Sequence, residues 1–353
     1  MSGARECPAF QSVPRDARDG GHRRVCLFHH TLTRSGKSAR VFERVPIPTP
    51  FQVGPVNAYL AGRTVVDPGP DSEDARERLH DALADRGLGF ADIEQVLVTH
   101  PHPDHFGLAS HLREAGGRVV AAEAAVPILE DFEGRLAYEQ EYFRRFFVRC
   151  GMDEATAGTV TELPQAFVHY APSVDVDRTL TAGETVAVDG RELGVDELVG
   201  HATGELLFAD GDGTAVVGDH VLGDTTPNPF LQPPPEDGGE RPRVLPAYNE
   251  SLARLREAGY DRLLPGHGDP VDDPPGRIDA ILAEHRERTA AVAGTVEEPA
   301  TPVEVMHALF EDLPVTEHFP GMSEAVGHLD VLATQDRVVR RETDGVLTYE
   351  LAE

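Results

Sequence analysis

The stretch Val98-Thr99-His100-Pro101-His102-Pro103-Asp104-His105-Phe106-Gly107 places three imidazoles and one carboxylate within six residues, His100 to His105. The apolar run before it, residues 93–98, is rich in β-branched side chains and is typical of a buried strand. We therefore expect the cluster on the loop that leaves the carboxyl end of a strand, where α/β sheets build their sites. Imidazole nitrogen and carboxylate oxygen are ligands that zinc and related metals prefer. An isolated histidine is usually a surface or core residue, but this spacing predicts a metal site.

Three later turns each place a His or an Asp beside glycine after an expected strand. They are Gly200-His201-Ala202, Gly218-Asp219-His220 and Gly266-His267-Gly268. Glycine lets the backbone turn sharply and approach a ligand closely, so the repetition makes His201, Asp219 and His267 candidates for the same site. We interpret His220 as a residue that supports the fold and not as a metal ligand. The histidines without motif support, which we leave out of the site, are His111, His169 and His285.

Strand and helix patterns alternate along the chain. Strands are expected at residues 53–60, 64–66, 93–98, 118–122, 185–188, 192–198, 206–209, 215–217 and 262–264. Helices are expected at residues 71–86, 105–115 and 252–258. The β–α–β–α–β order at the start predicts an α/β fold.

Residues 124–170 interrupt this pattern as a helical insertion, with helices expected at 128–151 and 153–168. Its aromatic side chains are Phe132, Tyr138, Tyr142, Phe143, Phe146 and Phe147. One interpretation is a lid over an apolar substrate. The alternative is plain packing of a helix against a core.

The composition of the chain excludes some functions. Its formal net charge is -29, and Lys37 is the only lysine. An acidic, lysine-poor surface suits a salt-rich cytoplasm, and a GC-rich genome is the alternative explanation. The charge argues against nucleic-acid binding.

The absence of a long apolar run argues against a membrane span. The three cysteines and the absence of a signal-peptide core favour a reduced, cytoplasmic protein.

Residues 1–44 differ from the rest because they carry a net charge of +5 and show no helical or alternating periodicity. We interpret them as a disordered basic tail without an assigned function.

Taken together, the motif His100-x-His102-x-Asp104-His105 with His201, Asp219 and His267 resembles the metallo-β-lactamase superfamily. The resemblance covers roughly residues 53–288 and fills all seven positions of the family's motif set. It implies a four-layer αββα sandwich with the site at one edge between two sheets. It also implies two metal ions, zinc by default with manganese or iron as alternatives.

The resemblance assigns a role to each of the seven residues. It places one metal on His100, His102 and His201 and the second metal on Asp104, His105 and His267. Asp219 would bridge the two ions, and a hydroxide held between them would be the nucleophile. Asp104 would also act in catalysis by orienting that hydroxide.

The same seven positions favour some branches of the superfamily over others. Asp219 resembles the bridging carboxylate of the glyoxalase II, RNase Z and lactonase branches, which disfavours antibiotic hydrolysis. His102 disfavours the flavodiiron branch, which carries a Glu there. Mononuclear persulfide dioxygenases keep much of this motif, so this branch remains an alternative.

The end of the chain has its own resemblance. Helices expected at 302–311 and 322–334, followed by a hairpin about Asp344-Gly345, resemble a small winged-helix domain. We therefore divide the chain into a tail (1–44), a catalytic domain (45–295) and a winged-helix-like domain (296–353). Residues 300–353 carry three basic and eleven acidic side chains, a net charge of -8 without a cationic footprint for nucleic acid.

These observations favour a binuclear hydrolase of an ester or thioester, similar to hydroxyacylglutathione hydrolases, with a small acyl substrate. The first alternative is a single-strand endoribonuclease of the β-lactamase-like type, because the same hydroxide can attack phosphorus. An alternative of another class is a metal-binding regulator without turnover. The sequence does not predict an oligomeric state.

Overall fold

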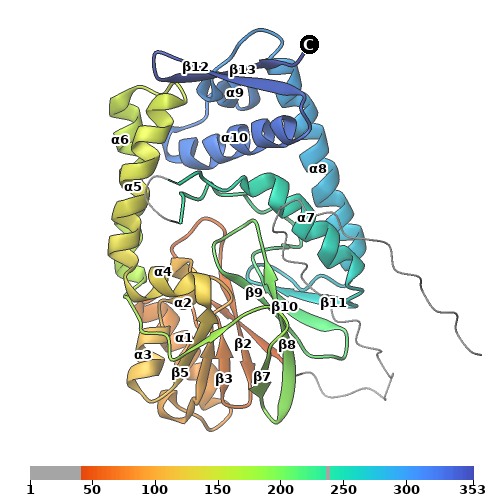
Figure 1. The fold of residues 1–353 in the computed structure, drawn as a ribbon. Coiled ribbons are helices and arrows are strands. Elements are labelled where there is room, and N and C mark those ends of the chain that lie inside the picture. Colours follow the sequence, from red (N-terminus) through yellow and green to blue (C-terminus); the bar gives the residue numbers. More distant parts are fainter. Residues whose placement is uncertain (1–40, 236–238) are drawn as a thin grey trace, which may run out of the picture.

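Two β-sheets pack face to face, and helices cover the outer face of each (Figure 1). The computed structural model describes residues 41–235 and 239–353. The main apolar core lies between the two sheets and under the helices of the first sheet. The expected α/β fold, a four-layer αββα sandwich, is confirmed.

The first sheet has six strands in sequence order, antiparallel from β1 to β3 and parallel from β3 to β6. Its strands are β1 (Glu43–Ile47), β2 (Val56–Ala61), β3 (Thr64–Val66), β4 (Gln95–Leu97), β5 (Arg118–Ala122) and β6 (Arg178–Leu180). Every residue of β2 and β3 is buried, as expected for strands that are covered on both faces.

The second sheet has five strands in the order β11-β10-β9-β8-β7, and only β10 and β11 pair in parallel. Its strands are β7 (Thr185–Val188), β8 (Arg191–Leu198), β9 (Glu205–Ala209), β10 (Thr214–Gly218) and β11 (Arg262–Pro265). Asp189 and Gly190 both have positive φ in the β7–β8 turn, as in the two-residue turns that join twisted strands.

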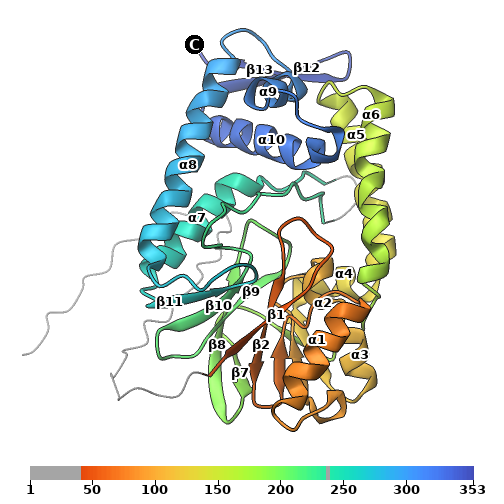
Figure 2. The same cartoon turned by 180° about the vertical axis from the view of Figure 1, so that it is seen from behind.

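Helices cover both sheets from outside (Figure 2). The first sheet carries α1 (Glu73–Ala84), α2 (Pro103–Phe106) and α3 (Ala109–Glu114), and the second carries α7 (Val244–Glu257) and α8 (Pro274–Thr295). The Ser72 side chain caps α1 by accepting a hydrogen bond from the Ala75 backbone. The strand β6 and the long helix α8 are not anticipated from the sequence.

The insertion forms α4 (Val126–Glu130), α5 (Phe132–Arg149), α6 (Glu154–Glu162) and a 3₁₀ segment (Leu163–Tyr170). The prediction of one helix over 128–151 is wrong, because Asp131 leaves the helical conformation and caps α5 through the Gly134 backbone. The second helix ends earlier than predicted, at Glu162, two residues before Pro164, which lacks an amide hydrogen.

The aromatic side chains of α5 mainly build a second core. Phe143 and Phe147 are buried and pack edge-on against Phe319, at centroid distances of 5.0 and 5.4 Å. This packing supports the alternative interpretation for these rings, a helix packed against a core, and a lid role of the insertion stays a prediction. Figure 1 shows α5 and α6 beside the helices at the end of the chain.

The end of the chain contains two helices and a hairpin. They are α9 (Pro302–Leu309), α10 (His318–Thr334), β12 (Val338–Thr343) and β13 (Val346–Leu351). Asp344 and Gly345 have positive φ, as the predicted hairpin turn requires. The helix α10 is buried along most of its length and contacts α7, α8 and α9. The winged-helix class and the domain boundary at 295/296 stay predictions.

The boundary of the basic tail needs correction. Residues 1–40 lie outside the described part, so the predicted disorder there is not addressed. Phe42 is buried, and Glu43 pairs with Leu60 in the first sheet. The basic residues nearby mask the alternation of Val45 and Ile47, which marks a strand. Within residues 41–235 and 239–353, none of the helices is both long and apolar enough to cross a membrane.

Candidate metal centre

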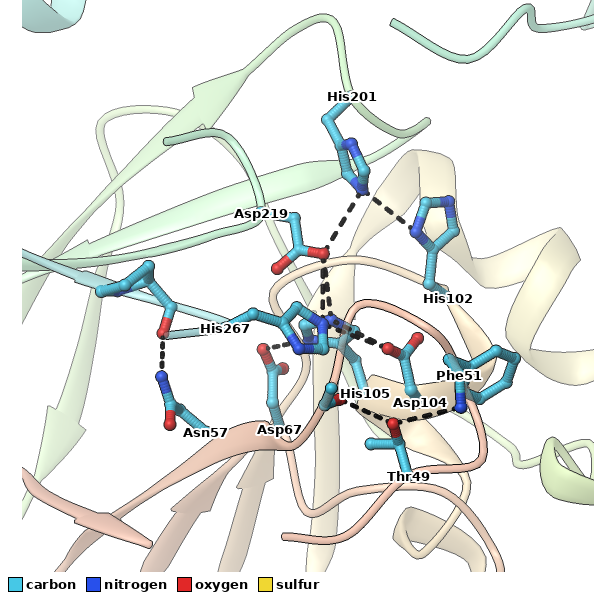
Figure 3. A network of polar contacts seen from close by, with 12 residues as sticks. Thr49, Phe51, Asn57, Asp67, His102, Asp104, His105, His201, Asp219 and His267 are labelled. Atoms are coloured by element: carbon cyan, nitrogen blue, oxygen red, sulfur yellow. Dashed lines mark hydrogen bonds and ion pairs between the residues drawn. The ribbon is translucent and has the colours of Figure 1, made fainter. Parts of the chain in front are cut away.

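The seven predicted site residues meet at one edge of the sandwich. Figure 3 labels all of them except His100. His100 and His102 follow β4 of the first sheet, and Asp104 and His105 lie in the short helix α2. The other three follow strands of the second sheet: His201 after β8, Asp219 after β10 and His267 after β11. Carboxyl ends of strands from both sheets therefore supply all seven side chains.

Three imidazoles form the first group. His102 Nδ1 lies 3.1 Å from His100 Nε2 and 3.1 Å from His201 Nε2. Two nitrogen ligands about 2.0 Å from one ion at a tetrahedral angle are about 3.3 Å apart. The spacing thus fits three nitrogens around one metal ion.

Asp104, His105 and His267 form a second group. His267 Nε2 lies 3.2 Å from Asp104 Oδ2, and His105 Nε2 lies 3.9 Å from the same oxygen. One carboxylate and two imidazoles again offer nitrogen and oxygen donors to a single point.

Asp219 lies between the two groups. Its Oδ2 atom is 3.7 Å from His201 Nε2 of the first group. The same oxygen is 3.4 Å from His267 Nε2 and 3.5 Å from His105 Nε2 of the second group. One carboxylate is therefore within reach of both candidate ion positions.

Residues behind the site orient the ring nitrogens. His105 Nδ1 donates to Asp67 Oδ2 (2.9 Å), and His267 Nδ1 donates to the Pro55 carbonyl (3.0 Å). Thr99 Oγ1 donates to Asp67 and lies 3.0 Å from His100 Nδ1, from which it can accept a hydrogen bond. In each ring the Nε2 atom is left to face the site, as metal-binding histidines require.

Asp67 itself also clusters with His100 and His105 within metal-binding distance. Its two oxygens, however, accept hydrogen bonds from Thr99 and His105. Asp67 is therefore a supporting residue. Asp67 was not among the predicted site residues. The signal that could have found it is its position in the Asp67-Pro68-Gly69 turn, directly after the expected strand at 64–66.

Burial keeps the first group neutral. It lowers the pKa of His102 to about 3 and that of His201 to about 4, with neighbouring imidazoles adding to the effect at His102. Burial also lowers the pKa of His100 well below its ordinary value. Neutral imidazole is the form that binds metals.

The second group attracts positive charge. Burial opposes a charge on His105 and His267, but the Asp219 and Asp104 carboxylates outweigh it and raise the pKa of both rings. The His105 and His267 rings in turn hold the pKa of Asp219 far below its usual range, against the effect of burial. A cation in this place would satisfy the same carboxylates.

Several buried polar atoms at the site have no hydrogen-bond partner. Two of them are Nε2 of His105 and Oδ1 of Asp219, and Nε2 of His267 has only its ion-pair contacts with carboxylates. An unpaired buried polar atom costs about 1–3 kcal/mol, so these atoms indicate a missing partner. The donor chemistry fits a divalent metal ion.

The histidines left out of the site lie elsewhere. His220 Nδ1 bonds to Glu205 (2.8 Å), His111 to Asp71 (2.9 Å) and His285 to Asn249 (2.7 Å). The His169 ring lies against that of the neighbouring Tyr170 in a tilted contact. Cys150 is buried in the second core, where burial raises the pKa of its thiol to about 12.

One aromatic residue at the site was missed. The Phe230 ring lies 6.1 Å from the His102 ring and 5.9 Å from the His201 ring, centroid to centroid. It belongs to a proline-rich loop whose sequence carries no periodic signal.

The fold and the site together define the class of protein. The profile of the metallo-beta-lactamase superfamily matches residues 51–267, more than half of the chain. The chain therefore belongs to this superfamily, and the resemblance noted from its motifs is confirmed.

Individual relatives extend this comparison. The chain is 31% identical to a protein of Bacillus subtilis (strain 168) described as "Probable metallo-hydrolase YqjP", over 83% of this chain and 92% of that one. A metallo-beta-lactamase family protein from Thermus thermophilus has a similar structure (TM-score 0.74, 27% identity, 88% of this chain and 99% of that chain). A beta-lactamase domain protein from Burkholderia ambifaria is also similar in structure (TM-score 0.75, 27% identity, 89% of this chain and 93% of that chain). These likenesses extend beyond residue 267, into the end of the chain.

Proposed function

We propose that the protein is a metal-dependent hydrolase that uses two divalent ions to cleave an ester or thioester bond. The observation that carries this proposal is the position of Asp219, whose Oδ2 lies 3.4–3.7 Å from imidazole nitrogens of both groups. A carboxylate shared in this way would hold two ions close together. The name of the Bacillus relative, a probable metallo-hydrolase, agrees with this class of reaction.

In this proposal His100, His102 and His201 hold the first ion, and Asp104, His105 and His267 hold the second. Both ions would be zinc, because imidazole and carboxylate suit it, with manganese or iron as alternatives. Two bound ions would supply a water molecule whose pKa is lowered from near 16 to about 7.

The protein's own groups would position the reaction. Asp104, whose side chain is 11% exposed, would accept a hydrogen bond from the attacking water and orient it towards the substrate. Asp67, Thr99 and the Pro55 carbonyl would keep the imidazoles in their binding orientation. No Ser or Cys nucleophile is required.

We assign the substrate to the acyl class on the basis of charge and surroundings. The net charge of -29 opposes a polynucleotide. An apolar ring, Phe230, lies beside the first group instead of a cation. A small ester or thioester meets both conditions.

The test combines metal analysis with a substrate panel. The protein, reconstituted with zinc or manganese, is assayed on acyl thioesters, aryl esters and a short single-stranded RNA, at low and high salt. The variants Asp219→Ala and His201→Ala should bind less than two ions and lose at least about 10³-fold in kcat/KM. His80→Ala, which removes an exposed imidazole from α1, should change neither quantity.

Each outcome separates one function from another. Turnover of thioesters or esters that depends on Asp219 supports the proposal. Cleavage of RNA alone would replace it with the endoribonuclease, and two bound ions without turnover on any substrate would favour the regulator.

A further inference from the structure

The site opens on the side of Phe230. Six of the seven candidate ligand residues are buried, and His102 alone is partly exposed. Phe230 is also partly exposed, with its ring near that of His102. A substrate that reaches the site past His102 therefore passes the Phe230 ring.

Hydrogen bonds hold the Phe230 loop on both sides. The Leu231 amide donates to Ser323 Oγ of α10 (3.2 Å). Thr203 Oγ1, two residues after His201, donates to Gln232 Oε1 (3.1 Å). The ring is thus placed in advance of binding, which lowers the entropic cost of using it as a contact.

A chain of aromatic rings supports Phe230 from behind. Its ring lies 6.4 Å from that of Phe319, which packs on Phe143 and Phe147 of the insertion. Phe319 of α10 and these two rings of the insertion form the support against which Phe230 rests.

Two arginines that bond near this loop are already paired. Arg288 Nη1 donates to Glu324 Oε2 (2.7 Å), and Arg277 Nε donates to the Leu222 carbonyl (2.7 Å). These two arginines make contacts within the protein, so their charges are not offered to an anionic group of a ligand. The proline residues beside the ring, Pro227 and Pro229, are buried. Among the described residues, the contact that the Phe230 side of the site offers beside His102 is therefore an aromatic ring.

We propose that Phe230 determines specificity by packing against an aliphatic acyl chain of the substrate. This proposal rests on the hydrolase function above and names the part of the substrate that the site prefers. An aromatic ring offers a large, rigid apolar face to a chain of methylene groups. Affinity should therefore increase with the length of the chain.

The test measures binding and turnover separately. Calorimetry compares butanoate with octanoate on the metal-loaded protein, and the two carry the same charge. Kinetics compares butanoyl with octanoyl thioesters. The variants are Phe230→Ala and Phe230→Leu, and the control is Phe90→Ala, which removes a half-buried ring at the opposite end of β4. Circular dichroism checks that each variant is folded.

Complete burial of one methylene improves binding by up to about fourfold. Octanoate should therefore bind the unmodified protein at least about tenfold more tightly than butanoate. Phe230→Ala should reduce this ratio to about threefold or less, Phe230→Leu should give an intermediate ratio, and Phe90→Ala should leave it unchanged. The ratio of kcat/KM values for the thioesters should follow the same order.

A chain-length ratio near one in the unmodified protein would overturn the inference, as would an unchanged ratio in a folded Phe230 variant. If Phe230→Ala does not fold, the same comparison with Phe230→Leu decides. If octanoate binding depends on Phe230 but no ester or thioester is cleaved, the proposed function fails while the inference about recognition stands.

Discussion

At the scale of single residues, Asp67 shows how a side chain outside the ligand set can control the site. Its backbone has φ +50°, and its two oxygens accept hydrogen bonds from the Thr99 amide (2.8 Å), the Thr99 hydroxyl (2.6 Å) and His105 Nδ1 (2.9 Å). These bonds determine which nitrogen of His105 faces the candidate metal position. The loop geometry and the ring orientation thus depend on one carboxylate.

We expect Asp67→Asn to weaken metal binding by about 10–100-fold, the usual effect of losing such a supporting group. Asn tolerates a positive φ, so the turn should persist while the charge behind His105 is lost. Chelator competition measures the affinity. Asp71→Asn, in a pair with His111 outside the site, is the matched control. Equal affinity in the unmodified protein and Asp67→Asn would show that Asp67 serves only the turn.

His285 predicts how stability depends on pH. Burial lowers the pKa of this ring to about 4, so the folded protein holds it neutral below pH 6.5, where the unfolded chain takes up a proton. Its contribution to the free energy of unfolding is present above pH 6.5 and is lost as the pH falls towards 4, by about 1.4 kcal/mol per pH unit.

His285→Gln should remove this contribution. Denaturant unfolding between pH 7 and pH 4 should show a shallower loss of stability in the variant. The histidines of the candidate metal centre are the same in both proteins, so their titration cancels in the difference. Identical slopes would contradict a neutral His285.

At the scale of elements, α5 connects the sandwich to the end of the chain. Phe147 is fully buried and packs on Phe319 of α10, while the next residue, Val148, is 37% exposed. The helix therefore presents one face to the second core and the other to solvent.

Phe147→Ala should lower the free energy of unfolding by about 3–5 kcal/mol, because it leaves a cavity in that core. Val148→Ala, on the exposed face, should cost less than about 1 kcal/mol. Chemical denaturation of both variants measures the difference. A small loss in Phe147→Ala would mean that the second core collapses around the cavity or contributes little to stability.

At the scale of the whole molecule, a net charge of -29 makes self-repulsion a general term in stability. Salt screens this repulsion, since the Debye length falls from about 10 Å at 0.1 M to about 3 Å at 1 M. The midpoint of thermal unfolding should therefore rise as KCl increases from 0.1 to 2 M. Sucrose at matched osmolality separates screening from general solvent effects. A constant or falling midpoint in KCl would contradict the interpretation of the acidic surface as an adaptation to salt.

The sequence by itself determined the elements of the site that depend on short-range patterns. The six residues from His100 to His105 are consecutive in the chain, so their spacing alone predicts a cluster of ligands. Glycines beside His201, Asp219 and His267 mark the other turns in the same way. Strand alternation and the Asp344-Gly345 turn are also local, because each follows from backbone preferences of adjacent residues.

Only the tertiary structure decided what depends on distant contacts. The place of Asp219 between two groups, the support of His105 by Asp67 and the approach of Phe230 to His102 each join segments far apart in the chain. The aromatic face of α5 looked the same in sequence whether it covered a substrate or a core, and only the structure places Phe143 and Phe147 against Phe319 in a core. The long helix α8 begins with two prolines and a glycine, which indicate a turn locally. Packing of Ile278 and Ile281 against the second sheet stabilises it, and no local pattern contains that contact.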